Sequence, residues 1–162
     1  MKKVTKGFLL PSAAFTVPRK LIRFYRRPSA QPCPGDLIYG EISRIGEHST
    51  LENKEGRIHM IYDGAKAVFV YGSRYAPDYY EGFVPNSLHR DVDLMARSGI
   101  VGRISVKNSG VKDPTRVQVL GVLCDEDGQQ LNTRQFTMIE PRAFEKKTPR
   151  AKLILVVGSS MN

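Results

Sequence analysis

Short apolar runs separated by polar turns form the main pattern between residues 36 and 138. β-branched and aromatic residues gather in these runs, and such residues favour strands. The expected strands cover residues 37–45, 57–62, 66–71, 81–84, 100–106, 116–123 and 130–138. Short strands with turns between them are typical of a small barrel or sandwich, so the sequence predicts a mainly β fold.

Two Asp-Gly pairs mark the expected tight turns. Asp127-Gly128 lies between the last two expected strands, and Asp63-Gly64 lies between 57–62 and 66–71. Because glycine adopts positive φ at little steric cost, each pair predicts a β-hairpin.

The remaining segments have weaker patterns. Gly40 indicates a bulge or bend within its strand. The polar segments 47–56 and 72–80 are expected to be loops. Residues 91–97 are compatible with one or two helical turns.

The net charge of +9 comes from one end of the chain. Residues 1–27 contain no acid, whereas the rest of the chain has 17 basic and 16 acidic side chains. The leader contains eight cations, Lys2, Lys3, Lys6, Arg19, Lys20, Arg23, Arg26 and Arg27. Charge concentrated in this way is typical of an arm, so residues 1–30 are expected to pack poorly or to form a separate helix over 19–27.

The function of this arm stays open between three alternatives. Arg19, Lys20, Arg23, Arg26 and Arg27 are the candidate residues for contact with nucleic-acid phosphates or with an anionic membrane surface. The third alternative is a solvated arm with no ligand.

Cysteine usage and hydropathy favour a cytoplasmic protein. The two cysteines, Cys33 and Cys124, form no CxxC pair, which favours a reducing compartment. Pro11 interrupts the apolar part of the leader and basic residues follow it, a pattern unlike a signal peptide. No apolar run reaches the length of about 20 residues that a transmembrane helix needs.

The sequence predicts neither a metal site nor catalytic residues in this chain alone. The spacing of His48, His59 and His89 fits no metal motif. No nucleophile elbow, Ser/His/Asp order or catalytic carboxylate pair stands out.

An unusual loop brings together Arg74, Tyr75, Asp78, Tyr79 and Tyr80. Tyrosine offers a rigid surface with a polar tip, and arginine binds carboxylates or phosphates, so these residues are a candidate ligand or partner surface. The structural alternative is that Tyr75 and Tyr79 or Tyr80 close one end of the barrel while Arg74 pairs with Asp78.

The C-terminal residues read KLILVVGSSMN. A continuous apolar run over 152–157 is typical of a central parallel strand, buried on both faces. Gly158, Ser159, Ser160 and Asn162 then follow, and small residues after such a strand leave backbone N–H groups free to bind a phosphate. The alternative is a last core strand with a frayed tail.

This stretch resembles the first strand and phosphate loop of P-loop NTPases of the dethiobiotin synthetase and MinD type. Upstream, GDLIYGEISRIGEHSTLENKEGR, YGSRYAPDYYEG and LGVLCDEDGQQLN resemble the N-terminal region of uncharacterised bacterial proteins that carry such a loop. The resemblance covers about residues 35–162 and implies a Gly-Lys-Thr downstream. It further implies ATP or GTP with Mg once that loop is completed, and no cofactor in this chain alone.

These observations divide the chain into a basic arm and linker (1–34), a β-barrel-like domain (35–140), a linker (141–151) and a possible first P-loop strand and loop (152–162). The first functional hypothesis is an accessory or regulatory domain whose partner is a downstream P-loop domain. The alternatives are a nucleic-acid-binding module that uses the arm, and a protein-docking scaffold that uses the Tyr-rich loop. An uncovered apolar strand also raises the prospect of a homo-oligomer.

Overall fold

The computed structural model describes residues 1–139 and 152–156, and this part of the chain is mainly β, as predicted. Its regular structure consists of strands and three short 3-10 helices. The strands are β1 (Lys2–Lys3), β2 (Phe24–Arg26), β3 (Leu37–Arg44), β4 (Thr50–Glu52), β5 (Ile58–Met60), β6 (Lys66–Tyr71), β7 (Arg74–Tyr75), β8 (Tyr80–Phe83), β9 (Asp91–Leu94), β10 (Ile100–Lys107) and β11 (Thr115–Cys124). The helices are η1 (Ser12–Ala14), η2 (Arg19–Leu21) and η3 (Thr133–Phe136).

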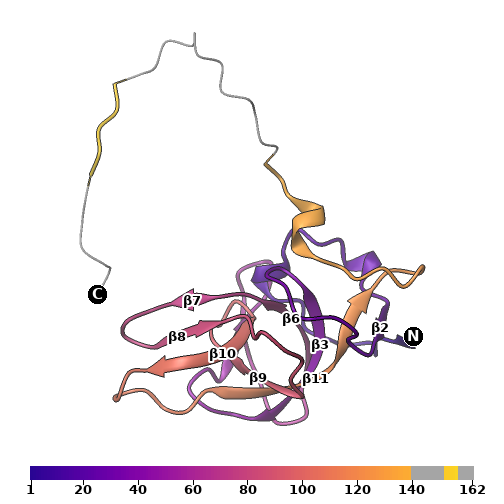
Figure 1. The fold of residues 1–162 in the computed structure, drawn as a ribbon, viewed down its shortest axis with the longest axis horizontal. Helices are drawn as coiled ribbons and strands as arrows, with labels where there is room; N and C mark the ends of the chain where they lie inside the picture. The colour runs from indigo at the N-terminus through magenta and orange to yellow at the C-terminus, as the bar shows by residue number, and fades with distance from the viewer. Residues whose placement is uncertain (140–151, 157–162) are drawn as a thin grey trace.

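Five strands close into a ring in the order β3, β6, β10, β9 and β11 (Figure 1). Four of the five contacts are antiparallel, and β6 and β10 run parallel. The buried side chain of Asp93 on β9 joins both neighbouring strands, because it accepts the backbone N–H of Ile104 at 3.0 Å and pairs with Arg116. The fold is therefore a small barrel.

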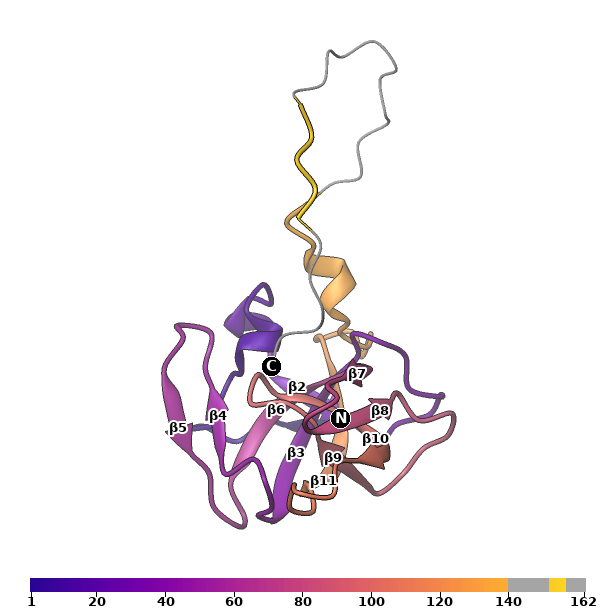
Figure 2. The same ribbon diagram turned by 90° about the vertical axis from the view of Figure 1, so that its left-hand side faces the viewer.

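Two ring strands continue beyond the barrel. The second half of β10 pairs with β8, which pairs with β7, and the end of β11 pairs with β2, which pairs with β1. Figure 1 shows β7 and β8 on one side of the ring and β2 on the other. Strands β4 and β5 form a separate two-stranded sheet at the side of the molecule (Figure 2).

The barrel interior is filled by alternate residues of all five ring strands. Ile38, Phe69, Val92, Val101 and Val117 are buried in one hydrophobic cluster. A Cβ on Gly40 would lie 2.6 Å from a methyl carbon of Val117 and 3.0 Å from the Phe69 ring. Opposite Gly40, the register of β11 shifts between Val119 and Gly121, so the irregularity predicted at Gly40 is present.

A second hydrophobic cluster covers the outer face of β3 and β6. Leu37 and Tyr39 of β3 and Val68 and Val70 of β6 point outward, and the leader packs on them. The leader contributes four buried side chains, Leu10, Ala14, Val17 and Ile22. The expectation that residues 1–30 pack poorly or separately is therefore wrong, because apolar side chains between the leader's cations complete this cluster.

The helix expected over residues 19–27 is also wrong. Only one 3-10 turn forms after Pro18, and Phe24 and Tyr25 then pair with Cys124 and Leu123 of β11. Pairing with a strand about 100 residues away outweighs the local helical spacing.

The turn at Asp127-Gly128 is confirmed, but only the first strand of that hairpin forms. Gly128 has φ +81° and donates its N–H to the carbonyl of Asp125 at 3.2 Å. Beyond single bridges at Gln130 and Asn132, the chain turns into η3. Asn132 and Gln135 form a capping box there, which satisfies the backbone N–H groups of Asn132 and Arg134.

Three other local expectations are corrected by long-range pairing. The segment expected to be loop at 47–56 contains β4, and β5 pairs with β4 instead of β6, although Gly64 does lie in a turn. Residues 91–94 form β9 between β10 and β11 instead of a helix. The loop over 72–80 contains β7.

Residues 152–156 form no strand. Leu153, Ile154, Leu155 and Val156 are 78–88% exposed. The strand expected over 152–157 is therefore not formed at residues 152–156 of this chain, and the alternative of a last core strand is wrong for them because their side chains are uncovered. Val157 lies outside the described residues.

The first prediction concerns the leader. Leu10→Ala and Ile22→Ala should each lower the free energy of unfolding by about 2–5 kcal/mol, because each leaves a cavity in the outer cluster. Phe15→Ala, at an exposed leader position, should change it by less than about 0.5 kcal/mol. Urea denaturation measures the change in unfolding free energy of each of these three variants. Equal, small effects would show that the leader is not part of the core.

Candidate functional site

The Tyr-rich loop is the tip of a hairpin formed by β7 and β8. Arg74 pairs with Gly82 and Tyr75 with Glu81. The tip is fixed to the neighbouring loop because Asn108 donates its backbone N–H to the Tyr79 carbonyl at 3.0 Å. The hairpin therefore holds the candidate side chains on a paired scaffold.

Three of the five predicted residues, Arg74, Tyr79 and Tyr80, meet around a histidine from another part of the chain. The His48 ring stacks on Tyr79, with centroids 6.0 Å apart, and meets the edge of Tyr80 at 5.9 Å. The Arg74 guanidinium lies 6.0 Å from the Tyr79 ring centre. Arg74 and the Nε2 atom of His48, at 3.0 Å, both bind the Met95 carbonyl oxygen. We call His48, Arg74, Tyr79 and Tyr80 the His48 cluster.

Burial sets the protonation of two members of the cluster. Burial lowers the pKa of His48, and the charges of Arg74 and Arg97 lower it further against the opposing effects of Met95 and Glu47. Burial raises the pKa of Tyr80 to about 12, and its hydroxyl donates to the Lys112 carbonyl at 2.7 Å. At neutral pH both side chains are therefore uncharged.

The other two predicted residues, Tyr75 and Asp78, lie away from this cluster. Both are exposed, and Arg74 binds the Met95 carbonyl instead of Asp78. The alternative in which Tyr75 closes the barrel and Arg74 pairs with Asp78 is wrong, whereas Tyr80 is fully buried. Tyr79 is partly exposed, so its ring is the part of the cluster that can contact a partner.

Sequence reasoning missed His48 and Met95. They lie far from residues 74–80 along the chain and meet them only through the sheet, so no spacing pattern marks them. Met95 contributes a backbone carbonyl, for which residue type carries no signal.

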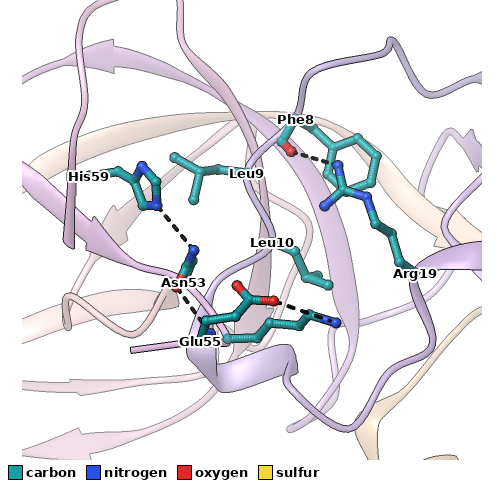
Figure 3. A pocket seen from close by; sticks show the side chains of 8 residues that line it. Phe8, Leu9, Leu10, Arg19, Asn53, Glu55 and His59 are labelled. Carbon is teal, nitrogen blue, oxygen red and sulfur yellow. Dashed lines mark hydrogen bonds and ion pairs between the residues drawn. The ribbon is translucent and has the colours of Figure 1, made fainter. Parts of the chain in front are cut away.

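A small pocket lies between the leader and the turn of the β4–β5 sheet (Figure 3). The Arg19 guanidinium lies 4.5 Å from the Phe8 ring centre at one end, and His59 bonds Asn53 at 3.1 Å at the other. Lys54 and Glu55 bring opposite charges to the pocket, 3.7 Å apart. Its volume of about 200 Å³ is below the range of about 300–1,000 Å³ typical of ligand pockets, so it does not fit a nucleotide.

The turn after β11 binds two of the leader's arginines. Arg23 pairs with Glu126, and Arg26 donates to the Gly128 carbonyl at 3.1 Å, both in the turn after β11. Arg19, Lys20 and Arg27 are exposed. Contact of these residues with nucleic acid or with an anionic surface stays a prediction.

The candidate phosphate-binding residues Gly158, Ser159, Ser160 and Asn162 lie outside the described residues. Among the described residues, no group of three His, Cys, Asp or Glu side chains is placed to hold a metal ion. No helix in residues 1–139 or 152–156 is long and apolar enough to cross a membrane.

Comparisons with protein-family models, curated proteins and solved structures give no significant match to this chain.

The second prediction concerns His48. Its pKa is lowered in the folded state, so the unfolded chain takes up the proton first as pH falls. Stability from His48 should be fully present above about pH 6.5 and should fall below it, towards the lower pKa of the folded state. His48→Gln keeps an N–H donor but does not titrate.

Urea denaturation of the native chain and of His48→Gln from about pH 8 to about pH 5 measures this difference. The stability advantage of the native chain should shrink below about pH 6.5. A constant difference across that range would contradict the lowered pKa.

Proposed function

We propose that the barrel is an accessory or regulatory domain of a nucleotide-binding P-loop protein, and that it performs no catalysis on its own. Residues 152–157 would begin the nucleotide-binding domain, and Gly158, Ser159, Ser160 and Asn162 would begin its phosphate loop. The bound ligand would be ATP or GTP with Mg, held by the completed loop.

The observation that carries this proposal is the exposure of Leu153, Ile154, Leu155 and Val156. Burial of a large apolar side chain contributes about 1.5–3 kcal/mol, so four such residues leave about 6–12 kcal/mol unused. A central parallel strand is buried on both faces by its neighbours and by helices, and it needs this unalternating sequence. A following α/β domain would therefore supply the missing cover.

The third prediction tests this proposal with a chain extended by about 150 residues, roughly one further domain, along its reading frame. The extended chain should bind ATP or GTP in a Mg-dependent way, measured by calorimetry. Gly158→Val should weaken that binding because its side chain would obstruct the phosphate, whereas Gly110→Val, in the loop between β10 and β11, should not.

Two results would count against the proposal. One is a reading frame without Gly-Lys-Ser or Gly-Lys-Thr shortly after Asn162. The other is nucleotide binding by residues 1–162 as tightly as by the extended chain.

Nucleic-acid binding is a second candidate function, favoured by one observation. All leader cations except Arg26 are exposed, and the leader that carries them is folded against the barrel. A fixed array of cations can neutralise successive phosphates.

The fourth prediction is that residues 1–162 bind a single-stranded oligonucleotide at low salt, with an affinity that falls steeply as salt rises. Lys20→Ala combined with Arg27→Ala should weaken binding and flatten the salt dependence. Lys112→Ala, in a loop beyond the leader, is the matched control. Fluorescence anisotropy measures these affinities, and absence of binding at low salt would remove this candidate.

A further inference from the structure

The outer edge of β5 has no strand partner among the described residues. β5 pairs with β4 through Thr50–Met60, Leu51–His59 and Glu52–Ile58, and it is the outermost strand in Figure 2. Ile61 donates its N–H to Ser49 at 3.1 Å, which shows that odd-numbered residues face β4. Backbone groups alternate along an antiparallel strand, so the N–H and C=O of Ile58 and Met60 point outward.

Three apolar side chains, two from β5 and a third from Tyr62 just beyond it, lie along one side of this edge. Ile58, Met60 and Tyr62 are 56%, 72% and 71% exposed. They occupy alternate positions, so they project from the same side, opposite to His59 and the buried Ile61. An open edge beside an apolar stripe is a template for pairing with another strand.

We propose that this edge joins two copies of the chain through antiparallel pairing of β5 with β5, about a twofold axis at Met60. This register places Ile58 opposite Tyr62 of the second copy, and Met60 opposite Met60. It also places Arg57, just before β5, opposite Asp63, in the turn that follows β5, twice by symmetry. Aromatic–β-branched pairs and opposite charges are favourable cross-strand neighbours. The segment RIHMIYD is thus complementary to itself when reversed.

The second copy fits this edge better than the chain's own apolar tail. Residues 152–156 carry Lys152 and no acid, so they offer nothing to pair with Arg57. A copy of β5 supplies an acid opposite each Arg57 and a cation opposite each Asp63. The contact is small, so the dimer should be reversible and concentration-dependent. This inference is independent of the proposed function.

The fifth prediction tests the edge by sedimentation of residues 1–162 over a range of concentrations. Met60→Pro should abolish the dimer, because it removes an outward N–H that β4 does not use. Met60→Leu keeps that N–H and an apolar side chain, so it should still form the dimer. Circular dichroism checks that both variants fold.

Charge reversal tests the register. Arg57→Asp places two acids opposite each other and Asp63→Arg places two cations, so each should weaken the dimer by about tenfold or more. The double variant should dimerise again, and an equimolar mixture of the two single variants should form heterodimers. Asp63 also accepts the N–H of Ile45 at 3.2 Å. The double variant lacks that bond too, so its recovery isolates the cross-strand pairs.

Several results would overturn the proposal. One is a native chain that stays monomeric at every concentration. Another is a dimer that survives Met60→Pro, because such a dimer would form through another surface such as residues 153–156. Failure of the double variant and of the mixture to recover would exclude this register. An unrelated peptide that binds the β5 edge of a monomeric chain would identify a foreign partner instead.

Discussion

Burial of both faces of β3 and β6 is the constraint on which the rest of the structure depends. Residues such as Ile38 and Phe69 fill the barrel, and their neighbours Leu37, Tyr39, Val68 and Val70 point outward. Covering four such side chains contributes about 6–12 kcal/mol, as much as the whole stability of a typical domain. The leader and the segment around Leu131 supply that cover. The leader is thus part of the fold, although its charge alone indicates a free arm.

Folding of the leader fixes the positions of its cations relative to the barrel. A free arm samples many positions, whereas this leader is fixed to the barrel by bonds such as that from the Val68 N–H of β6 to the Leu9 carbonyl, at 3.0 Å. The acidic turn after β11 neutralises part of the same surface through Glu126 and Arg23. Any anionic partner therefore meets a rigid and partly compensated array, and binding there costs little conformational entropy.

Sequence patterns predicted the strands and turns whose own residues favour that conformation. They did not predict strands that form only because distant parts of the chain pair with them. β6 was predictable because four of its six residues, Val68, Phe69, Val70 and Tyr71, are strongly β-forming, and the turn at Gly128 because an Asp-Gly pair favours the positive φ found there. β9 was not, because Val92 and Leu94 become a strand only between β10 and β11. The same distinction applies to the residues of the His48 cluster. Arg74, Tyr79 and Tyr80 lie within seven residues, whereas His48 joins them only through the tertiary fold.

The barrel protects some of its edges and leaves others open. Each ring strand has two neighbours, and the large sheet ends at β1 and β7, which are two residues long and offer little edge for pairing. Exposed apolar stretches remain at β5 and at residues 153–156. The first lies on the folded body and offers an open edge, which favours another strand. The second consists of four consecutive exposed apolar side chains, which favours burial on both faces by another domain. Strand pairing at β5 and burial of residues 153–156 use different parts of the chain. Both contacts can therefore form in one protein at the same time.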